Sequence, residues 1–235
     1  MIMKSGMEAS DIIWAATAII NDLGANPSRR GVVLLAYGSL VHVDPSEGTG
    51  FIPQPWRRLR DLTRQAIISH DAFFVLASGN ARSGAIYETT DQMPAINAGL
   101  RMGFLPLKIV GACDNDGILA PFSQQYPYIR VWAPGMDATC ARDGGITTDD
   151  GTSLSAGMVA GLAAHFLGFE IPPFTIGGGR TASNLNTFFE DTSWPRARTV
   201  AGGLPSVLWN LKDESHNPVL LSASNASALA NVAIS

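Results

Sequence analysis

The sequence predicts an α/β protein with a mostly parallel β-sheet. Four short apolar runs, rich in branched side chains, have the composition of strands that are buried on both faces. Helical patterns separate these runs, and strands that alternate with helices are typical of parallel sheets. The 235 residues suffice for one domain of ordinary size. We expect that domain over residues 1–221 and a flexible tail over residues 222–235.

The first predicted helix covers residues 10–24. Ser10 is a suitable N-cap, Gly24 a suitable end, and Ile13 and Ile20 recur on one face. This periodicity is typical of a folded amphipathic helix and argues against a signal peptide. No apolar run approaches the roughly 20 residues that cross a bilayer, so we expect no membrane partner.

The other elements follow in a regular order. We expect strands at residues 31–37, 72–77, 105–112 and 128–135, and helices at residues 56–69 and 181–190 and, within residues 150–168, from Ser153 onward. The arginines of the second helix alternate with Asp61 and are interpreted as a solvated face. A net charge of −4 also gives no attraction to nucleic acid, so none is expected as a partner. Cys113 and Cys140 have no metal-site spacing, and neither a metal nor a cofactor is expected.

Residues 150–168, "DGTSLSAGMVAGLAAHFLG", combine a short polar lead with a helix of small and apolar residues. So slim a helix lets other backbone pack against it on several sides. Its N–H groups and its positive dipole end point at whatever lies beyond Ser153, and they favour a developing oxyanion there. A serine in this place is either an ordinary helix cap or a nucleophile.

Four segments in a common order carry a resemblance to a known family. "GTSLSAGMVAGLAA" resembles the serine-bearing segment of the subtilisin-like serine proteases, the subtilases. "GVVLLAYGS", "FFVLASGN" and the run from "KIVGACDNDG" to "VWAPG" resemble family segments that precede that serine. The resemblance implies a partial subtilisin-like three-layer α/β fold whose N-terminal strands are missing. It also implies a serine endopeptidase that hydrolyses peptide bonds, outside the cell.

The resemblance also implies roles for individual residues. Ser153 would attack the scissile carbonyl, and Asn80 would donate to the oxyanion together with the Ser153 N–H. Tyr37, Gly38 and Ser39 would pair with an extended peptide or protein substrate, and Ala77, Ser78 and Gly79 would line its side-chain pocket. The chain departs from the family at Gly157, where subtilases usually have proline, so the first turn of the helix is expected to be less rigid.

No clear general base accompanies Ser153. In subtilases the triad aspartate and histidine precede the serine, in a region upstream of the matching segments. His165 lies roughly 18 Å along the same helix and is interpreted as a partner of the last-turn carbonyls. His70 and His216 are assigned to a helix end and to a polar surface stretch. His42, with Asp44 nearby, is the one candidate, although a loop histidine is more often a bystander.

We therefore expect the chain as written to be inactive, with the missing N-terminal half of the domain as a partner. The alternative is a non-catalytic, subtilase-like module that binds a peptide or a partner chain. Without upstream strands, the run at residues 31–37 would form an apolar open edge, so marginal stability is expected.

Other readings of the motifs are weaker. An α/β-hydrolase needs Gly-x-Ser-x-Gly, which Ser153 lacks. Gly177–Gly179 fits a loose dinucleotide pattern but is interpreted as a turn before a helix, and Asp114 with Asp116 as turn chemistry after a strand.

Overall fold

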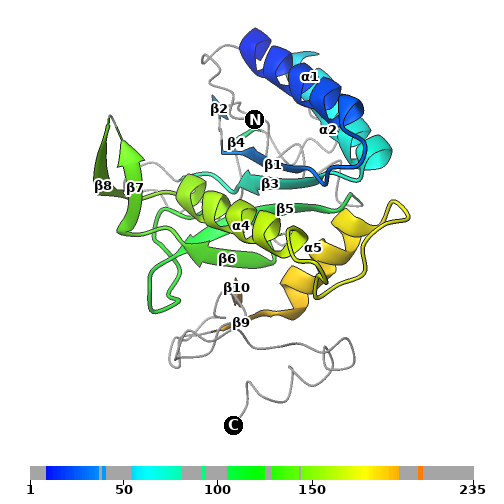
Figure 1. The fold of residues 1–235 in the computed structure, drawn as a ribbon. Coiled ribbons are helices and arrows are strands. Elements are labelled where there is room, and N and C mark those ends of the chain that lie inside the picture. Colours follow the sequence, from blue (N-terminus) through cyan, green and yellow to red (C-terminus); the bar gives the residue numbers. More distant parts are fainter. Residues whose placement is uncertain are drawn as a thin grey trace, which may run out of the picture.

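The fold is a six-stranded sheet with helices on both faces (Figure 1). The computed structural model describes residues 9–36, 39–40, 54–80, 92–93, 105–124, 129–142, 144–195 and 206–208. The sheet contains β1 (Val32–Leu35), β3 (Phe73–Ala77), β5 (Leu107–Cys113), β6 (Val131–Pro134), β9 (Ser193–Pro195) and β10 (Ser206–Leu208). The helices are α1 (Ala9–Ala25), α2 (Gln54–His70), α4 (Thr152–Leu167) and α5 (Thr181–Asp191).

The sheet is mostly parallel, as the sequence predicts. Its strand order is β1-β3-β5-β6-β10-β9, and every pair is parallel except β10 with β9. The carboxyl ends of the parallel strands therefore gather at one edge of the sheet, where α/β proteins usually place their sites. Two small antiparallel pairs accompany the sheet: β2 (Ser39–Leu40) with β4 (Gln92–Met93), and β7 (Ala138–Arg142) with β8 (Gly145–Asp149).

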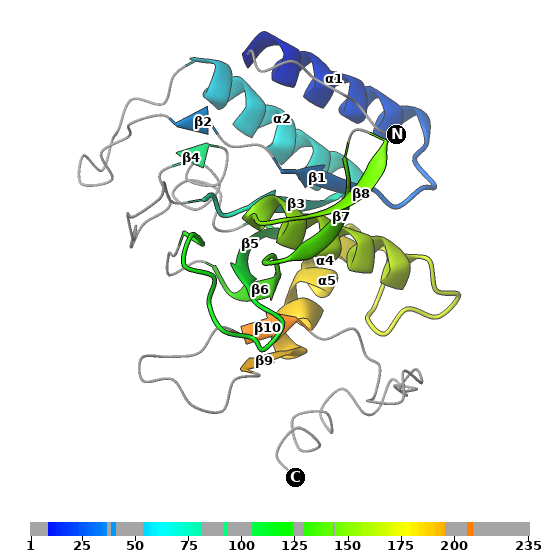
Figure 2. The ribbon, with the colours of Figure 1, turned by 90° about the vertical axis from the view of Figure 1, so that its left-hand side faces the viewer.

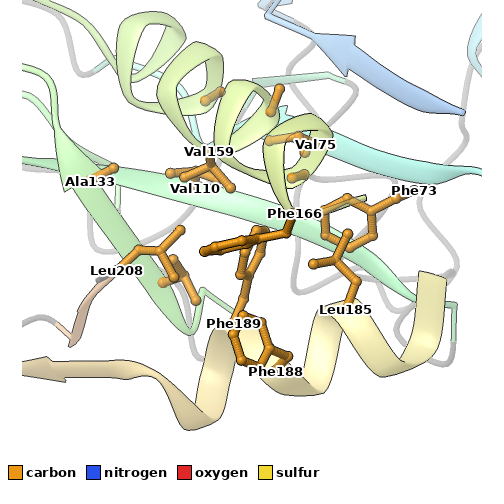
Figure 3. Packing of buried hydrophobic residues seen from close by; sticks show 14 of the residues in the cluster. Phe73, Val75, Val110, Ala133, Val159, Phe166, Leu185, Phe188, Phe189 and Leu208 are labelled. Carbon is orange, nitrogen blue, oxygen red and sulfur yellow. The ribbon is translucent and has the colours of Figure 1, made fainter. Parts of the chain in front are cut away.

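Alternate residues of β3 divide the core between the two faces of the sheet. Phe73 and Val75 point into a cluster with α4 and α5, where the rings of Phe166 and Phe189 pack beside Phe73 (Figure 3). The alternate residues of β3, Phe74 among them, are directed toward α1 and α2 instead. Figure 2 shows the sheet between these two helical layers. Both faces of the central strand are thus covered, which explains its continuous apolar sequence.

Helix α4 lies against β1, β3, β5 and β6 with its small residues toward the sheet. Ala156, Ala160 and Ala163 are buried, and their short side chains allow the helix to approach the strands closely. Close neighbours were expected on several sides of this helix. At Gly157 and Gly161, however, no atom lies within 4 Å of the position of an added Cβ. The close packing therefore lies on the sheet side.

Three local features differ from the prediction. Leu34 of β1 is 41% exposed, although the composition of this run predicts burial on both faces; β1 is the outermost strand of the described sheet, which agrees with the open edge expected at residues 31–37. The last-turn carbonyl of Leu167 in α4 accepts a hydrogen bond from Arg30 Nη1 at 2.6 Å, whereas His165 packs its ring edge-on against Phe169. The β7–β8 hairpin and the pair β9–β10 had no counterpart among the predicted strands.

Two predictions about turns agree with the structure. Asp114 Oδ1 accepts from the backbone N–H groups of Asp116 and Ile118, as expected for a turn after β5. Gly177 to Gly179 all have positive φ and form the turn that leads into α5. Among the described residues no helix has the length and apolar character that a bilayer crossing requires. The predicted tail, residues 222–235, lies outside the described residues.

Candidate active site

The candidate site lies where the carboxyl end of β3 meets the first turn of α4. Asn80 follows β3, and Ser153 is the second residue of α4. Asn80 Oδ1 accepts two hydrogen bonds from Thr152, at 3.0 Å from the backbone N–H and at 2.9 Å from the hydroxyl. The carboxamide of Asn80 is thereby fixed to the residue that directly precedes Ser153. The structure thus brings together two residues that are more than 70 positions apart in the sequence.

Two nitrogen atoms border a small space beside Gly151. A Cβ added to Gly151 would lie 3.3 Å from Asn80 Nδ2 and 3.8 Å from the backbone nitrogen of Ser153. Among the described residues, no acceptor is found for the Ser153 N–H. The backbone of Gly151 is extended, with φ 163°, so the lack of a side chain provides space here and is not needed for the conformation. An anionic oxygen in this space would meet donors from a helix N-terminus and from a carboxamide.

The start of α4 is tied to the end of β6. The Gly151 N–H donates to the Gly135 carbonyl at 2.8 Å, and the hydroxyl of Ser155 donates to the Ala133 carbonyl at 3.0 Å. A side chain at Gly135 would overlap both the Ser155 hydroxyl and the Gly151 carbonyl. These contacts hold the first turn of α4 at a fixed height above the strand ends.

The Ser153 hydroxyl is exposed and points toward β1. It donates a 3.3 Å hydrogen bond to the carbonyl of Ala36, which cannot act as a base. Of the histidines in the described residues, His165 lies in the last turn of the same helix and His70 lies before β3, at the end opposite to Asn80. His42 and His216 lie outside the described residues. The described part of the chain therefore places no histidine beside Ser153.

The predicted pocket residues at the end of β3 are all buried. Gly79 uses both backbone groups: its N–H donates to Thr152 Oγ1 at 3.2 Å, and its carbonyl accepts from the Gln124 N–H at 3.1 Å. Ser78 and Ala77 are 0% and 8% exposed. The Ser78 hydroxyl has no hydrogen-bond partner among the described residues. Their role as a pocket lining stays a prediction.

The predicted peptide-pairing segment is described only in part. Tyr37 and Gly38 lie outside the described residues. Ser39 belongs to β2 and pairs with Met93 of β4 in an antiparallel arrangement. Within the described ranges, no group of three acidic, cysteine or histidine side chains is arranged to hold a metal ion.

Comparison with known proteins decides the family. The sequence model of the subtilase family matches residues 3–177, which is most of the described chain and includes both Asn80 and Ser153. The chain belongs to the subtilase family. The resemblance noted in the four sequence segments is thereby confirmed. The subtilase match ends within the turn before α5, so the family model reaches neither α5 nor the strands β9 and β10.

Subtilases among the curated proteins match part of the chain. Subtilisin-like protease 7 of Arthroderma otae is 32% identical over 108 residues, and alkaline serine protease ver112 of Corniculantispora psalliotae is 30% identical over 103 residues. These alignments cover 46% and 43% of this chain and 24% of each relative. The matched part of the chain thus spans about a quarter of the length of these relatives.

Solved protease structures share the fold. A cold-adapted subtilisin-like serine proteinase superposes with a TM-score of 0.58 at 21% identity, over 84% of this chain and 62% of that protein. The prenylagaramide maturation protease PagA gives 0.62 at 20% identity, over 89% and 68%. Identities at this level show the fold alone. They agree with the α/β class that the sequence predicts.

Sequence reasoning missed the part that Thr152 has in this site. Thr152 is 1% exposed, and its side chain contacts both Gly79 and Asn80. A usable signal was its position, because a β-branched hydroxyl residue in the first turn of a helix can bond to neighbouring backbone and side chains.

Proposed function

We propose that this chain carries the nucleophile and the oxyanion-binding groups of a subtilase-type serine endopeptidase. Ser153 is the nucleophile that attacks the carbonyl of an extended peptide. The Asn80 carboxamide and the Ser153 N–H stabilise the negative charge on the tetrahedral intermediate. The observation that carries this proposal is the hydrogen bond from the Thr152 N–H to Asn80 Oδ1, because it anchors the carboxamide at the first turn of α4.

The proposed reaction also needs a proton acceptor for the serine hydroxyl. A Ser-His-Asp site without its base retains only the modest catalysis of the oxyanion groups and of substrate binding. Because neither histidine of the described residues lies beside Ser153, we propose that the chain by itself is inactive toward peptides. A polypeptide with the upstream half of a subtilase domain is the proposed partner that would supply the base. An extracellular location is part of the same proposal.

A second candidate function is a module that binds extended peptides without cleaving them. The observation that favours it is the placement of His165 and His70, the two histidines of the described chain, away from Ser153. Such a module would use Tyr37, Gly38 and Ser39 to pair with the peptide backbone, as an added strand does.

Chemical rescue separates the two candidates. The chain is incubated with a fluorophosphonate, with and without imidazole as an external base, and the modified residue is identified by mass spectrometry. If Ser153 is a nucleophile without a base, imidazole accelerates the modification at this residue. Ser153→Ala removes the modification, and Ser183→Ala, which removes an exposed hydroxyl of α5, leaves it in place.

A folded chain whose Ser153 stays unmodified at every imidazole concentration would contradict the peptidase proposal and favour the binding module. Folding is checked in the same samples by circular dichroism.

A further inference from the structure

We propose that the outer groove between α1 and α2 binds an acidic segment of an extended peptide, with Arg58 as the main contact. This groove is a cleft lined by Ile13 of α1 and by Gln54, Arg58 and Asp61 of α2, and it has a volume of about 430 Å³. The inference goes beyond the proposed function, because it needs no step of the peptidase reaction.

The three lining residues of α2 lie on one side of that helix, because they are spaced by four and three positions. Helix α1 packs alongside α2, and Figure 2 shows the two helices side by side on one face of the sheet. Ile13 gives the α1 wall of the cleft an apolar surface, whereas α2 contributes an amide, a cation and an anion. A concave surface with this mixture of groups suits a peptide, which is itself partly apolar and partly polar.

Helix α2 is basic in a chain that is acidic overall. Its four arginines and one aspartate give a net charge of +3 with the histidine neutral, whereas the whole chain has a net charge of −4. No acidic residue lies in the first turn of α2, so the positive end of the helix dipole adds to this charge. The sequence alone interprets these arginines as a solvated face, and the structure adds a cleft beside them. Charges of one sign around a cleft attract a ligand of the opposite sign.

The one carboxylate of the cleft is already paired. Arg60 Nε and Nη2 both donate to Asp61 Oδ1, at 3.0 Å and 2.9 Å. Arg58 and Arg64 are exposed, and neither has an ion-pair partner among the described residues. An acidic ligand in the cleft would therefore meet an uncompensated guanidinium at Arg58. Guanidinium groups bind carboxylates through two parallel, charge-assisted hydrogen bonds.

An acidic peptide fits this surface better than other polyanions do. Nucleic acid needs basic contacts along an extended backbone, whereas these arginines belong to one helix of a chain with a negative net charge. A membrane surface is flat, whereas the cleft is concave and has Asp61 in its lining. A glutamate or aspartate side chain that enters the cleft would reach Arg58 while the neighbouring peptide residues follow the groove.

The experiment measures the fluorescence anisotropy of a rhodamine-labelled peptide of alternating glutamate and glycine as the full chain is added. We expect saturable binding that weakens with added salt, and no binding of the matching peptide of glutamine and glycine. Arg58→Gln should weaken the affinity about three- to fivefold, because one exposed charge pair is lost. Arg29→Gln is the matched control, since it removes the same charge from an exposed position before β1 and should leave the affinity unchanged.

Asp61→Asn gives a test in the opposite direction. It removes the carboxylate from the cleft and frees Arg60, so the affinity for the glutamate peptide should rise about threefold. Equal losses in Arg58→Gln and Arg29→Gln would reveal an effect of net charge alone and overturn the proposal. Arg58-dependent binding of phosphatidylserine vesicles or of a single-stranded oligonucleotide, without binding of the glutamate peptide, would overturn it as well. Because the assay involves no cleavage, its result is independent of the peptidase proposal.

Discussion

Two helix N-termini on the same face of the sheet are completed by residues from opposite ends of one strand. Before β3, Asp71 accepts from the N–H groups of Thr181 and Ala182, at 2.8 Å and 3.0 Å, and so caps α5 with a carboxylate. After β3, Asn80 accepts from the N–H of Thr152 at the start of α4. The first cap is charged and uses both carboxylate oxygens, whereas the second is neutral and presents a donor as well.

We propose that this difference gives one kind of geometry two uses, stability at the start of α5 and binding at the start of α4. A carboxylate satisfies the exposed N–H groups and the positive end of the helix, so nothing further is attracted to it. A carboxamide satisfies one N–H group with its oxygen and adds its own NH2 to the donors that remain. The start of α5 is therefore closed, and we propose that the start of α4 receives an anion.

Asn80→Asp would make the start of α4 resemble that of α5, and it should have the largest effect. A carboxylate repels an oxyanion, and loss of an oxyanion donor in a subtilase typically costs about 100- to 1000-fold in rate. We expect a loss of this size in imidazole-assisted modification of Ser153. The free energy of unfolding, measured in urea, should stay the same or rise by about 0.5–1 kcal/mol. Retained reactivity in Asn80→Asp would contradict the proposed role of Asn80.

Asp71→Ala would open the start of α5. Two charge-assisted hydrogen bonds are lost, and alanine is strained at the positive φ of 52°, so we expect a loss of about 2–3 kcal/mol in the free energy of unfolding. Asp71→Asn is the matched control. It keeps one acceptor and tolerates the left-handed backbone, so about half of that loss is expected. An Asp71→Ala chain as stable as the unmodified one would show that this cap does not hold α5.

Lys108→Met tests the charge at the other end of α5. Lys108 in β5 is 2% exposed and pairs with Glu190 of α5 at 2.7 Å. Burial lowers the pKa of Lys108 below 10.5, although the hydrogen bond and charge of Glu190 oppose this shift. The unfolded chain thus holds the Lys108 proton more tightly, and the stability of the unmodified chain should rise with pH up to about 10.5.

Lys108→Met removes the cost of burying the ammonium group, and Glu190, whose side chain is 42% exposed, stays solvated without its partner. The variant should therefore gain about 1 kcal/mol over the unmodified chain near neutral pH. That advantage should shrink as the pH is raised, as measured by urea unfolding at a series of pH values. An advantage that grows with pH would show that the Glu190 pair outweighs the burial of the lysine.

The smallest effects on stability and on the modification of Ser153 are expected for alanine substitutions at two glycines of the α4 region. The two substitutions should differ in which of these quantities they change. Gly157→Ala meets no atom within 4 Å, so we expect a gain of about 0.5–1 kcal/mol in the free energy of unfolding from helix propensity. Gly151→Ala should change stability little, but it crowds Asn80 Nδ2 and should slow the modification of Ser153. Equal reactivity in both variants would argue that the space beside Gly151 has no role.

The fold could be predicted where apolar periodicity and sheet position agree. The central strands and all four described helices lie where the sequence predicts them. Strands β3 and β5 are covered on both faces, and their continuous apolar composition indicates this burial. The exposure of Leu34 was not predicted from composition, because the expected edge strand at residues 31–37 has the same apolar composition as a strand buried on both faces. The β7–β8 hairpin carries few buried residues, so its sequence has no apolar alternation to detect.

The site could be predicted only in outline. The pairing of Asn80 with the start of α4 follows from a resemblance and not from spacing, since residues so far apart in sequence share no local pattern. The capping of α5 by Asp71 was missed for the same reason, because a residue before a strand carries no sign of the helix that it will contact. The choice of Arg30 over His165 at the end of α4 also depends on tertiary contacts alone.

The length of strand β3 sets the distance between the two residues that cap α5 and α4. Asp71 and Asn80 are nine positions apart, and each must reach a helix at its own end of the sheet. Insertion or deletion of a single residue in this stretch would displace one of the two caps and turn the strand's side chains to the wrong faces. Length changes should therefore be tolerated far less in this segment than in the turn before α5.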